Sequence, residues 1–281
     1  MGPFPGRILS VLLICGLGVA LLAQAPSSPP SGGAGDLLVA PTRVVFEGRK
    51  RAAEVSLSNV GQTRATYRIS LVRMEMDEGG GVRDRPLDPS SENLQSLFRF
   101  SPREVTLEPQ ESQTVRIQVR KPAELPTGEY RLHMLFRAVP PPAEAAPLPT
   151  EAPKELSIKL TAIYGVAIPL IIRQGETSAK VSIAEPVLDG TAHSLQFRLD
   201  RSGNGSIFGD VHASLIPAEG LPETLAETAG LAVYPPNASR RVTLALPPAK
   251  PLPRGTRIRI TFTLPPQDGG NLLAETFLTV P

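Results

Sequence analysis

The residues best suited to metal or acid-base chemistry in this chain are its three histidines, His133, His193 and His212. Each stands alone in an expected strand or turn, without a second ligand at the helix or hairpin spacing that metal sites use. We therefore interpret them as surface or satisfied structural histidines. The sequence also has no G-x-S-x-G elbow, Walker loop or H-E-x-x-H motif. These patterns predict a protein that is not an enzyme, holds no metal or cofactor and takes no small-molecule substrate.

A different kind of chemistry, the binding of another polypeptide, is suggested by residues 156–160. Leu156, Ile158 and Leu160 alternate with polar residues, as in a strand with one apolar face. They follow Pro140–Pro153, a proline- and alanine-rich segment that we expect to be a mobile loop. From the residues alone, two interpretations stay open. The three side chains form a core face of their own domain, or they are lent to a partner.

Composition limits the architectures that could position these residues. With 24 glycines, 31 prolines and few aromatic residues, the chain favours short strands joined by turns over long helices. The charges nearly balance, at 29 basic against 27 acidic residues, so we expect no nucleic-acid partner.

The first 25 residues have the features of an export signal. Arg7 supplies positive charge, residues 8–22 are almost wholly apolar, and Ala23-Gln24-Ala25 fits a cleavage site, although Pro26 directly after it is unusual there. The apolar run is shorter than the roughly 20 residues that a bilayer core requires, which favours secretion over an anchor. Cys15 is the only cysteine and lies inside this run, so we expect the mature chain to contain no disulfide.

The rest of the chain alternates between apolar and polar residues in short stretches, with no comparably long helical periodicity. Val55 and Leu57 are one example and Ile69 and Leu71 are another: the apolar residues lie two positions apart, so they share one face of a strand. We expect a flexible leader at 26–35 and two β-sandwich domains at 36–173 and 176–281. The predicted fold class is all-β, with two tandem immunoglobulin-like sandwiches after a signal peptide.

Several segments of the first domain resemble the periplasmic chaperones of the chaperone-usher pilus pathway. Thr42–Gly48 is similar to the first-strand motif of that family. Ser101–Pro109 followed by Gln113–Arg116 resembles its central signature, and Leu125–Pro141 follows its pattern. The second domain agrees mainly in length, position and strand content.

The resemblance implies roles for particular residues. Arg43 matches the arginine with which the family grips the terminal carboxylate of a pilus subunit. Leu156, Ile158 and Leu160 fall where the family presents the donor strand. Glu129 and Arg173 fall near positions that fix the angle between the domains. Pro169 stands where the family normally has a second anchor, a lysine, so Arg43 acts alone, or another basic group replaces the lysine, or carboxylate capture is weakened.

The function implied by the resemblance is that of a periplasmic chaperone. It would bind pilus or fimbrial subunits by donor-strand complementation and deliver them to an outer-membrane usher, with possible self-association when free. The alternative is a structural or adhesive β-sandwich protein of the envelope that lends no strand.

Overall fold

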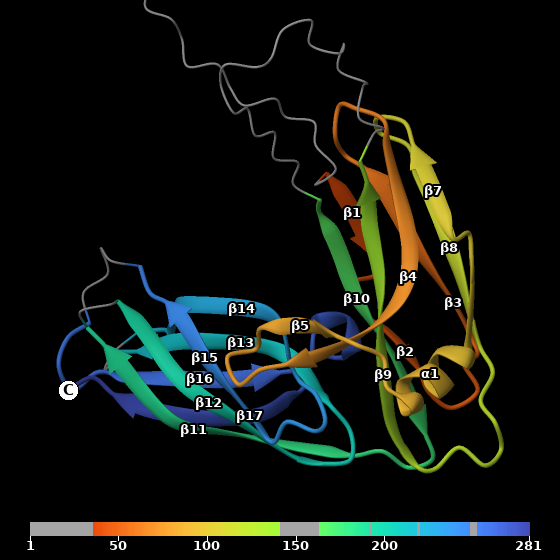
Figure 1. The fold of residues 1–281 in the computed structure, drawn as a ribbon. Helices are drawn as coiled ribbons and strands as arrows, with labels where there is room; N and C mark the ends of the chain where they lie inside the picture. The colour runs from red at the N-terminus through yellow and green to blue at the C-terminus, as the bar shows by residue number, and fades with distance from the viewer. Residues whose placement is uncertain (1–35, 141–162, 191–192, 218–219, 248–251) are drawn as a thin grey trace, which may run out of the picture. The chain divides into compact units, whose positions relative to one another are not determined.

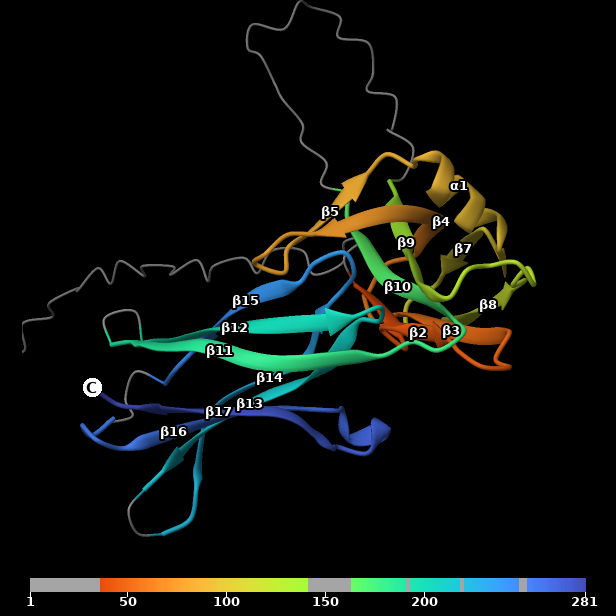
Figure 2. The same cartoon turned by 90° about the horizontal axis from the view of Figure 1, so that it is seen from below.

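The computed structural model describes residues 36–140, 163–190, 193–217, 220–247 and 252–281, all of which belong to one compact unit. These residues form two β-sandwiches in series, as the sequence predicts (Figures 1 and 2). The expected signal at 1–25, the leader at 26–35 and the proposed donor residues Leu156, Ile158 and Leu160 lie outside the described residues. Within the described part of the chain, no helix is long and apolar enough to cross a membrane.

The first sandwich contains two sheets. One has the strand order β1-β3-β8-β6 and the other β2-β10-β9-β4-β5, with β7 also paired to β4. The strands are β1 (Leu37–Ala40), β2 (Val44–Phe46), β3 (Ala52–Asn59), β4 (Ala65–Met76), β5 (Val82–Arg85), β6 (Phe98–Ser101), β7 (Glu104–Leu107), β8 (Ser112–Val119), β9 (Gly128–Val139) and β10 (Gly165–Gln174).

The second sandwich is built from a sheet of order β11-β12-β15 and one of order β14-β13-β16-β17. A short 3-10 turn, η1 (Pro266–Asp268), joins the last two strands. The strands are β11 (Ala179–Asp189), β12 (Ser194–Gly203), β13 (Ile207–Ile216), β14 (Glu223–Val233), β15 (Ser239–Ala245), β16 (Arg257–Thr263) and β17 (Leu272–Thr279).

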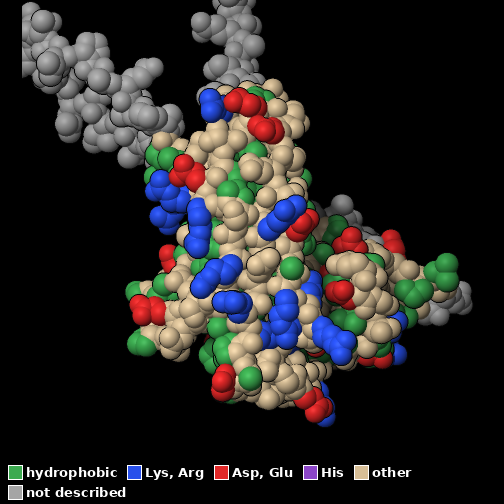
Figure 3. All heavy atoms as spheres, turned by 90° about the vertical axis from the view of Figure 1, so that its right-hand side faces the viewer, with side chains coloured by type: hydrophobic (Ala, Val, Ile, Leu, Met, Phe, Trp, Pro, Cys, Tyr) green, Lys and Arg blue, Asp and Glu red, His purple; other side chains and the backbone are tan. Residues whose placement is uncertain are grey.

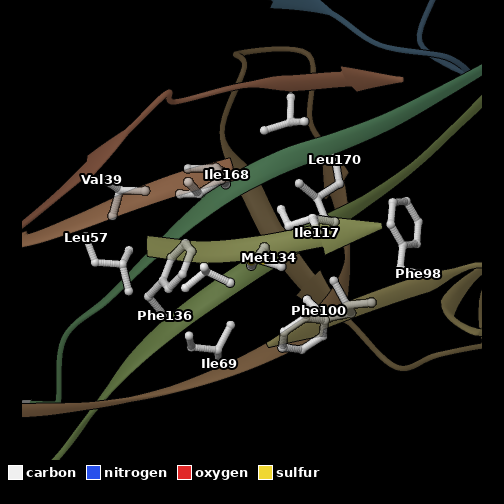
Figure 4. Packing of buried hydrophobic residues seen from close by; sticks show 14 of the residues in the cluster. Val39, Leu57, Ile69, Phe98, Phe100, Ile117, Met134, Phe136, Ile168 and Leu170 are labelled. Atoms are coloured by element: carbon white, nitrogen blue, oxygen red, sulfur yellow. The ribbon is translucent and has the colours of Figure 1, made fainter. Parts of the chain in front are cut away.

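Each sandwich has its own apolar core, as alternation with a period of two requires. In the first, Leu57 from β3, Ile117 from β8 and Phe136 from β9 are completely buried between the two sheets (Figure 4). In the second, Val211 from β13 and Phe262 from β16 are completely buried as well. Since each such side chain contributes about 1.5 to 3 kcal/mol on burial, the cores hold the sandwiches without any disulfide.

Two local features stabilise the turns of the first sandwich. The side chain of the buried Asn59 donates to the carbonyls of Thr63, Leu107 and Glu108 and accepts from the backbone N–H of Gly61. The hydroxyl of Tyr130 donates to the carbonyl of Pro126 at 2.8 Å, which is the tyrosine corner of immunoglobulin-like folds.

The structure adds one helix that the sequence pattern did not reveal, α1 (Pro89–Ser96). Asp88 caps it by accepting from the backbone N–H of Ser91, and proline occupies the first helical position. Hydrogen bonds from Ser90 and Ser91 hold the pKa of the Asp88 carboxyl below its usual value. The helix is too short for apolar periodicity to be visible.

Lys and Arg side chains gather in the middle of the face of the molecule drawn in Figure 3.

Two exposed ion pairs lie on the surface of the first sandwich. Across the outer face of β3 and β8, Arg116 contacts Glu54 at 3.2 Å, and Arg68 of β4 contacts Glu104 of β7 at 3.1 Å. Because all four side chains are well exposed, each pair adds roughly 1 kcal/mol at most. These charges therefore serve mainly as a solvated surface.

Candidate functional site

A cavity of about 420 Å³ is lined by residues of both sandwiches. From the first sandwich it receives side chains of β2 and β10, together with Arg43, which directly precedes β2. From the second it receives residues of β11, β13 and the β16–β17 connection. The lining residues used below are Arg43, Glu47, Arg173, Ser206 and Phe208.

Arg43 is the cation of this cavity that forms no ion pair within the described residues. Its Nη2 donates to the hydroxyl of Ser206 at 3.3 Å, and its guanidinium lies over the ring of Phe208, 4.5 Å from the centroid. Its Nε is buried and has no hydrogen-bond partner in the described part of the chain. Burial lowers the pKa of Arg43, whereas the neighbouring Tyr234 raises it. A largely desolvated arginine without a carboxylate is suited to binding an anion.

Glu129 links the two sandwiches at the edge of the same cavity. Its carboxylate, whose side chain is only 1% exposed, accepts from Arg173 Nε at 3.1 Å. The same oxygen accepts from the backbone N–H and the hydroxyl of Ser206, at 3.0 and 2.9 Å. Arg173 also contacts Glu47 at 3.3 Å. Glu129 thus contacts Arg173 within the first sandwich and Ser206 of the second, and the interdomain role of Glu129 and Arg173 stays a prediction.

The register of β2 explains how Arg43 and Pro169 become neighbours. Val44, Val45 and Phe46 pair in parallel with Leu170, Ile171 and Ile172 of β10. Extending this register by one residue toward the N-terminus sets Arg43 beside Pro169. Arg173 is the other arginine of the cavity, but Glu129 and Glu47 already neutralise it. Among the described residues, no lysine stands in for the one that the resemblance implies at Pro169, and Ser206 is the group that shares the space around Arg43.

Strand β10 has an open edge beside Arg43. On one side, β9 pairs with its whole length, from Gly165 to Gln174. On the other side, within the described residues, β2 pairs only with Leu170–Ile172. The backbone from Gly165 to Pro169 therefore has no strand on that side in the described part of the chain. Since proline has no N–H to donate, Pro169 suits the point where pairing stops.

Three residues of this site were not found by sequence reasoning: Ser206, Phe208 and Tyr234. All three come from the second sandwich, where the resemblance carries no motif. Tyr234 directly follows β14 and is 7% exposed, and the guanidinium of Arg131 lies 3.9 Å from its ring centroid. Phe208 and Tyr234 pack in one apolar cluster with Val45 and Ile171 of the first sandwich, and only this tertiary packing brings them near Arg43.

One expectation about the histidines was wrong. His133, on β9 opposite Pro169, is buried, and its Nδ1 has no hydrogen-bond partner among the described residues, so it is neither a surface nor a satisfied histidine. Burial, with a smaller contribution from the charge of Arg131, lowers the pKa of His133 to about 3. No cluster of metal-ligating side chains is present in the part of the chain that the structure describes.

The comparison with protein families gives one match. Residues 36–174 match the family described as "Pili and flagellar-assembly chaperone, PapD N-terminal domain". The matched range starts one residue before β1 and ends with the last residue of β10, so it corresponds to the first sandwich. A search of curated proteins found no significant match to the sequence.

Solved structures of similar fold include several chaperones. The Pseudomonas aeruginosa CupB2 chaperone is 17% identical, with 87% of this chain and 100% of that chain covered and a TM-score of 0.42. The Salmonella enterica SafA pilin in complex with the SafB chaperone gives 17% identity, 88% and 97% coverage and a TM-score of 0.41. The E. coli chaperone DraB gives 14% identity, 87% and 96% coverage and a TM-score of 0.41.

Proposed function

We propose that this chain captures pilus subunits in the periplasm by lending them a β-strand and passes them to an outer-membrane usher, because its first sandwich matches the family of pilus-assembly chaperones. The observation that carries the proposal is the position of Arg43. It lines a cavity, has no carboxylate partner among the described residues and stands at the end of the open edge of β10.

The geometry suggests how a subunit would be seated. A chain end whose carboxylate binds Arg43 can place its preceding residues along β10, from Pro169 back toward Gly165. Because β10 runs from Gly165 toward Pro169, that segment would lie parallel to β10. Its backbone N–H and C=O groups would then pair with the open edge, as in other cases of strand addition.

The apolar residues near this edge support the same seating. Ile163 and Tyr164 directly precede β10 and are each 56% exposed. In the sequence, the alternating Leu156, Ile158 and Leu160 come shortly before them. We propose that these three side chains fill the groove of an incomplete subunit. Burial of each contributes about 1.5 to 3 kcal/mol before ordering costs, which exceeds what an exposed ion pair contributes.

The proposal is tested by co-expressing the full chain with a pilus subunit and purifying the complex from the periplasm. Ile158→Asp places an unpaired carboxylate in the proposed interface and is expected to abolish the complex. Ser157→Asp, at the adjacent position of opposite parity, is the matched control and is expected to keep it. If Ile158→Asp retains the subunit as well as the control does, strand donation at this site is wrong.

The alternative, a structural or adhesive envelope protein that lends no strand, predicts a different result in the same experiment. The wild-type chain would then retain cell-wall or surface components and no subunit. The family match of the first sandwich favours the chaperone.

A further inference from the structure

Arg43 belongs to the first sandwich, yet its side chain is held by residues of the second. Its guanidinium lies over the ring of Phe208 in β13, 4.5 Å from the centroid, and its Nη2 donates to the hydroxyl of Ser206, two residues earlier in the chain. The face of an aromatic ring attracts a cation electrostatically and most strongly where water is excluded. Phe208 therefore restricts the orientation of Arg43 as well as stabilising its charge.

Tyr234 approaches Arg43 from another direction. It packs in the same apolar cluster as Phe208, the ring under the guanidinium, and its hydroxyl forms a hydrogen bond with Arg43 that raises the pKa of Arg43 against the effect of burial. Tyr234 itself is fixed, because it packs in a small apolar cluster with Ile171 of the first sandwich. The guanidinium of Arg131 covers its ring at 3.9 Å.

These contacts matter because an arginine side chain is otherwise mobile. An unrestrained guanidinium loses its rotamer freedom only when the anion binds, and that loss weakens binding. A guanidinium already held between an aromatic face and a hydroxyl loses little more. Arg43 also forms no ion pair within the described residues: the nearby Glu129 acts on it electrostatically but is bound through one oxygen to Arg173 and Ser206.

We propose that Phe208 and Tyr234 are positioning residues for Arg43, so that the second sandwich sets the affinity of the first for a chain-terminal carboxylate. The inference rests on the proposed function, in which Arg43 binds that carboxylate. It goes further by assigning a recognition role to two aromatic residues of the domain that carries no family motif. Neither residue contacts the anion in this scheme; both act through Arg43.

The test uses the full processed chain and two synthetic probes, the acetylated peptide Val-Thr-Val-Thr-Val with a free carboxylate and the same peptide as its terminal amide. Its length matches the open edge from Gly165 to Pro169. Dissociation constants are measured by NMR titration, and the ratio of amide to acid isolates the contribution of the carboxylate. Arg43→Gln is expected to reduce this ratio to about one, because only the charge-assisted contact distinguishes the probes.

Phe208→Leu is expected to reduce the wild-type ratio by about 5-fold, the size of effect that a partly buried cation–aromatic contact allows. Tyr234→Phe removes a hydrogen bond to Arg43 and is expected to reduce the ratio by a similar factor. Phe208→Tyr keeps the aromatic face and is expected to keep the wild-type ratio of amide to acid dissociation constants. Phe277→Leu is the matched control: Phe277 lies under Arg257 at 4.4 Å in the same sandwich but does not line the cavity, so the ratio should not change. A purely structural role would lower both affinities and leave the ratio unchanged.

The possible failures are distinguishable. If the wild-type chain does not discriminate between acid and amide, the anchor role of Arg43 is wrong, and the positioning roles are refuted with it. If the wild-type chain discriminates and both aromatic variants keep the full ratio, the positioning roles are wrong while the anchor stands. Tyr234→Phe removes a single hydroxyl, so it keeps the test decisive should Phe208→Leu fail to fold.

Discussion

Glu129 offers the sharpest test of how the two sandwiches are joined. Its side chain is 1% exposed, and one carboxylate oxygen accepts from Arg173 and twice from Ser206. Glu129→Ala removes all three hydrogen bonds and leaves the backbone N–H of Ser206 without its acceptor. Replacing one partner of a buried ion pair typically costs about 3 to 5 kcal/mol.

The local geometry places the expected loss at the lower end of that range. Arg173 keeps Glu47 as a second partner at 3.3 Å and its side chain is 22% exposed, so its charge is not left buried without a partner. The N–H of Ser206 contributes a penalty of about 1 to 3 kcal/mol for an unsatisfied buried donor. We therefore expect Glu129→Ala to lower the free energy of unfolding by about 3 kcal/mol.

Urea unfolding followed by far-UV circular dichroism measures this loss, a suitable probe because the chain has no tryptophan. Glu275→Ala is the control: Glu275 contacts Arg259 at 2.9 Å, but its side chain is 38% exposed. That variant should lose about 1 kcal/mol or less. Equal losses for Glu129→Ala and Glu275→Ala would refute the reasoning, because burial would then have no influence on the strength of the contact.

Two further predictions concern His133 and Gly209. The pKa of His133 is about 3 in the folded chain and about 6.5 in the unfolded chain. Because the unfolded state therefore binds a proton first as the pH falls, the free energy of unfolding decreases from about pH 6.5 toward about pH 3. His133→Leu should remove up to about 1.4 kcal/mol per pH unit of this slope, measured by urea unfolding across that range; an unchanged slope would show that His133 titrates normally. A Cβ added at Gly209 would lie 2.3 Å from the carbonyl oxygen of Thr263, so Gly209→Ala should destabilise the second sandwich by about 1 to 3 kcal/mol. The control Gly190→Ala, where a Cβ meets nothing within 4 Å, should be neutral, and equal thermal stability of the two variants would contradict this account.

The all-β fold could be predicted from the sequence because alternation has a direct structural cause. Side chains in a strand point alternately to the core and to solvent, so Val55 and Leu57, or Ile69 and Leu71, reveal their strands without any tertiary information. Strand β14 is not evident from the sequence, since Glu223–Val233 has no regular apolar alternation and is held by pairing with β13. Helix α1 was missed because it is only 8 residues long.

The candidate site was only partly predictable. Arg43, Glu129 and Arg173 could be named because they lie in or near motifs of the first sandwich, and the structure places all three beside one cavity or at its edge. Their roles in subunit binding and domain orientation stay predictions. Nothing in the sequence indicates that Ser206 supplies the contact to Glu129, because the two residues are 77 positions apart and no motif marks Ser206.

By itself, the sequence determined the strand content, the two-sandwich organisation and the residue types available for binding, since these follow from local alternation and turn chemistry. Only the tertiary structure decided which of those residues meet. The burial of His133, the open edge of β10 beside Arg43, and the contact of Arg43 with the ring of Phe208 all depend on long-range packing. Such packing joins residues according to sheet order and register, which no short stretch of the chain encodes.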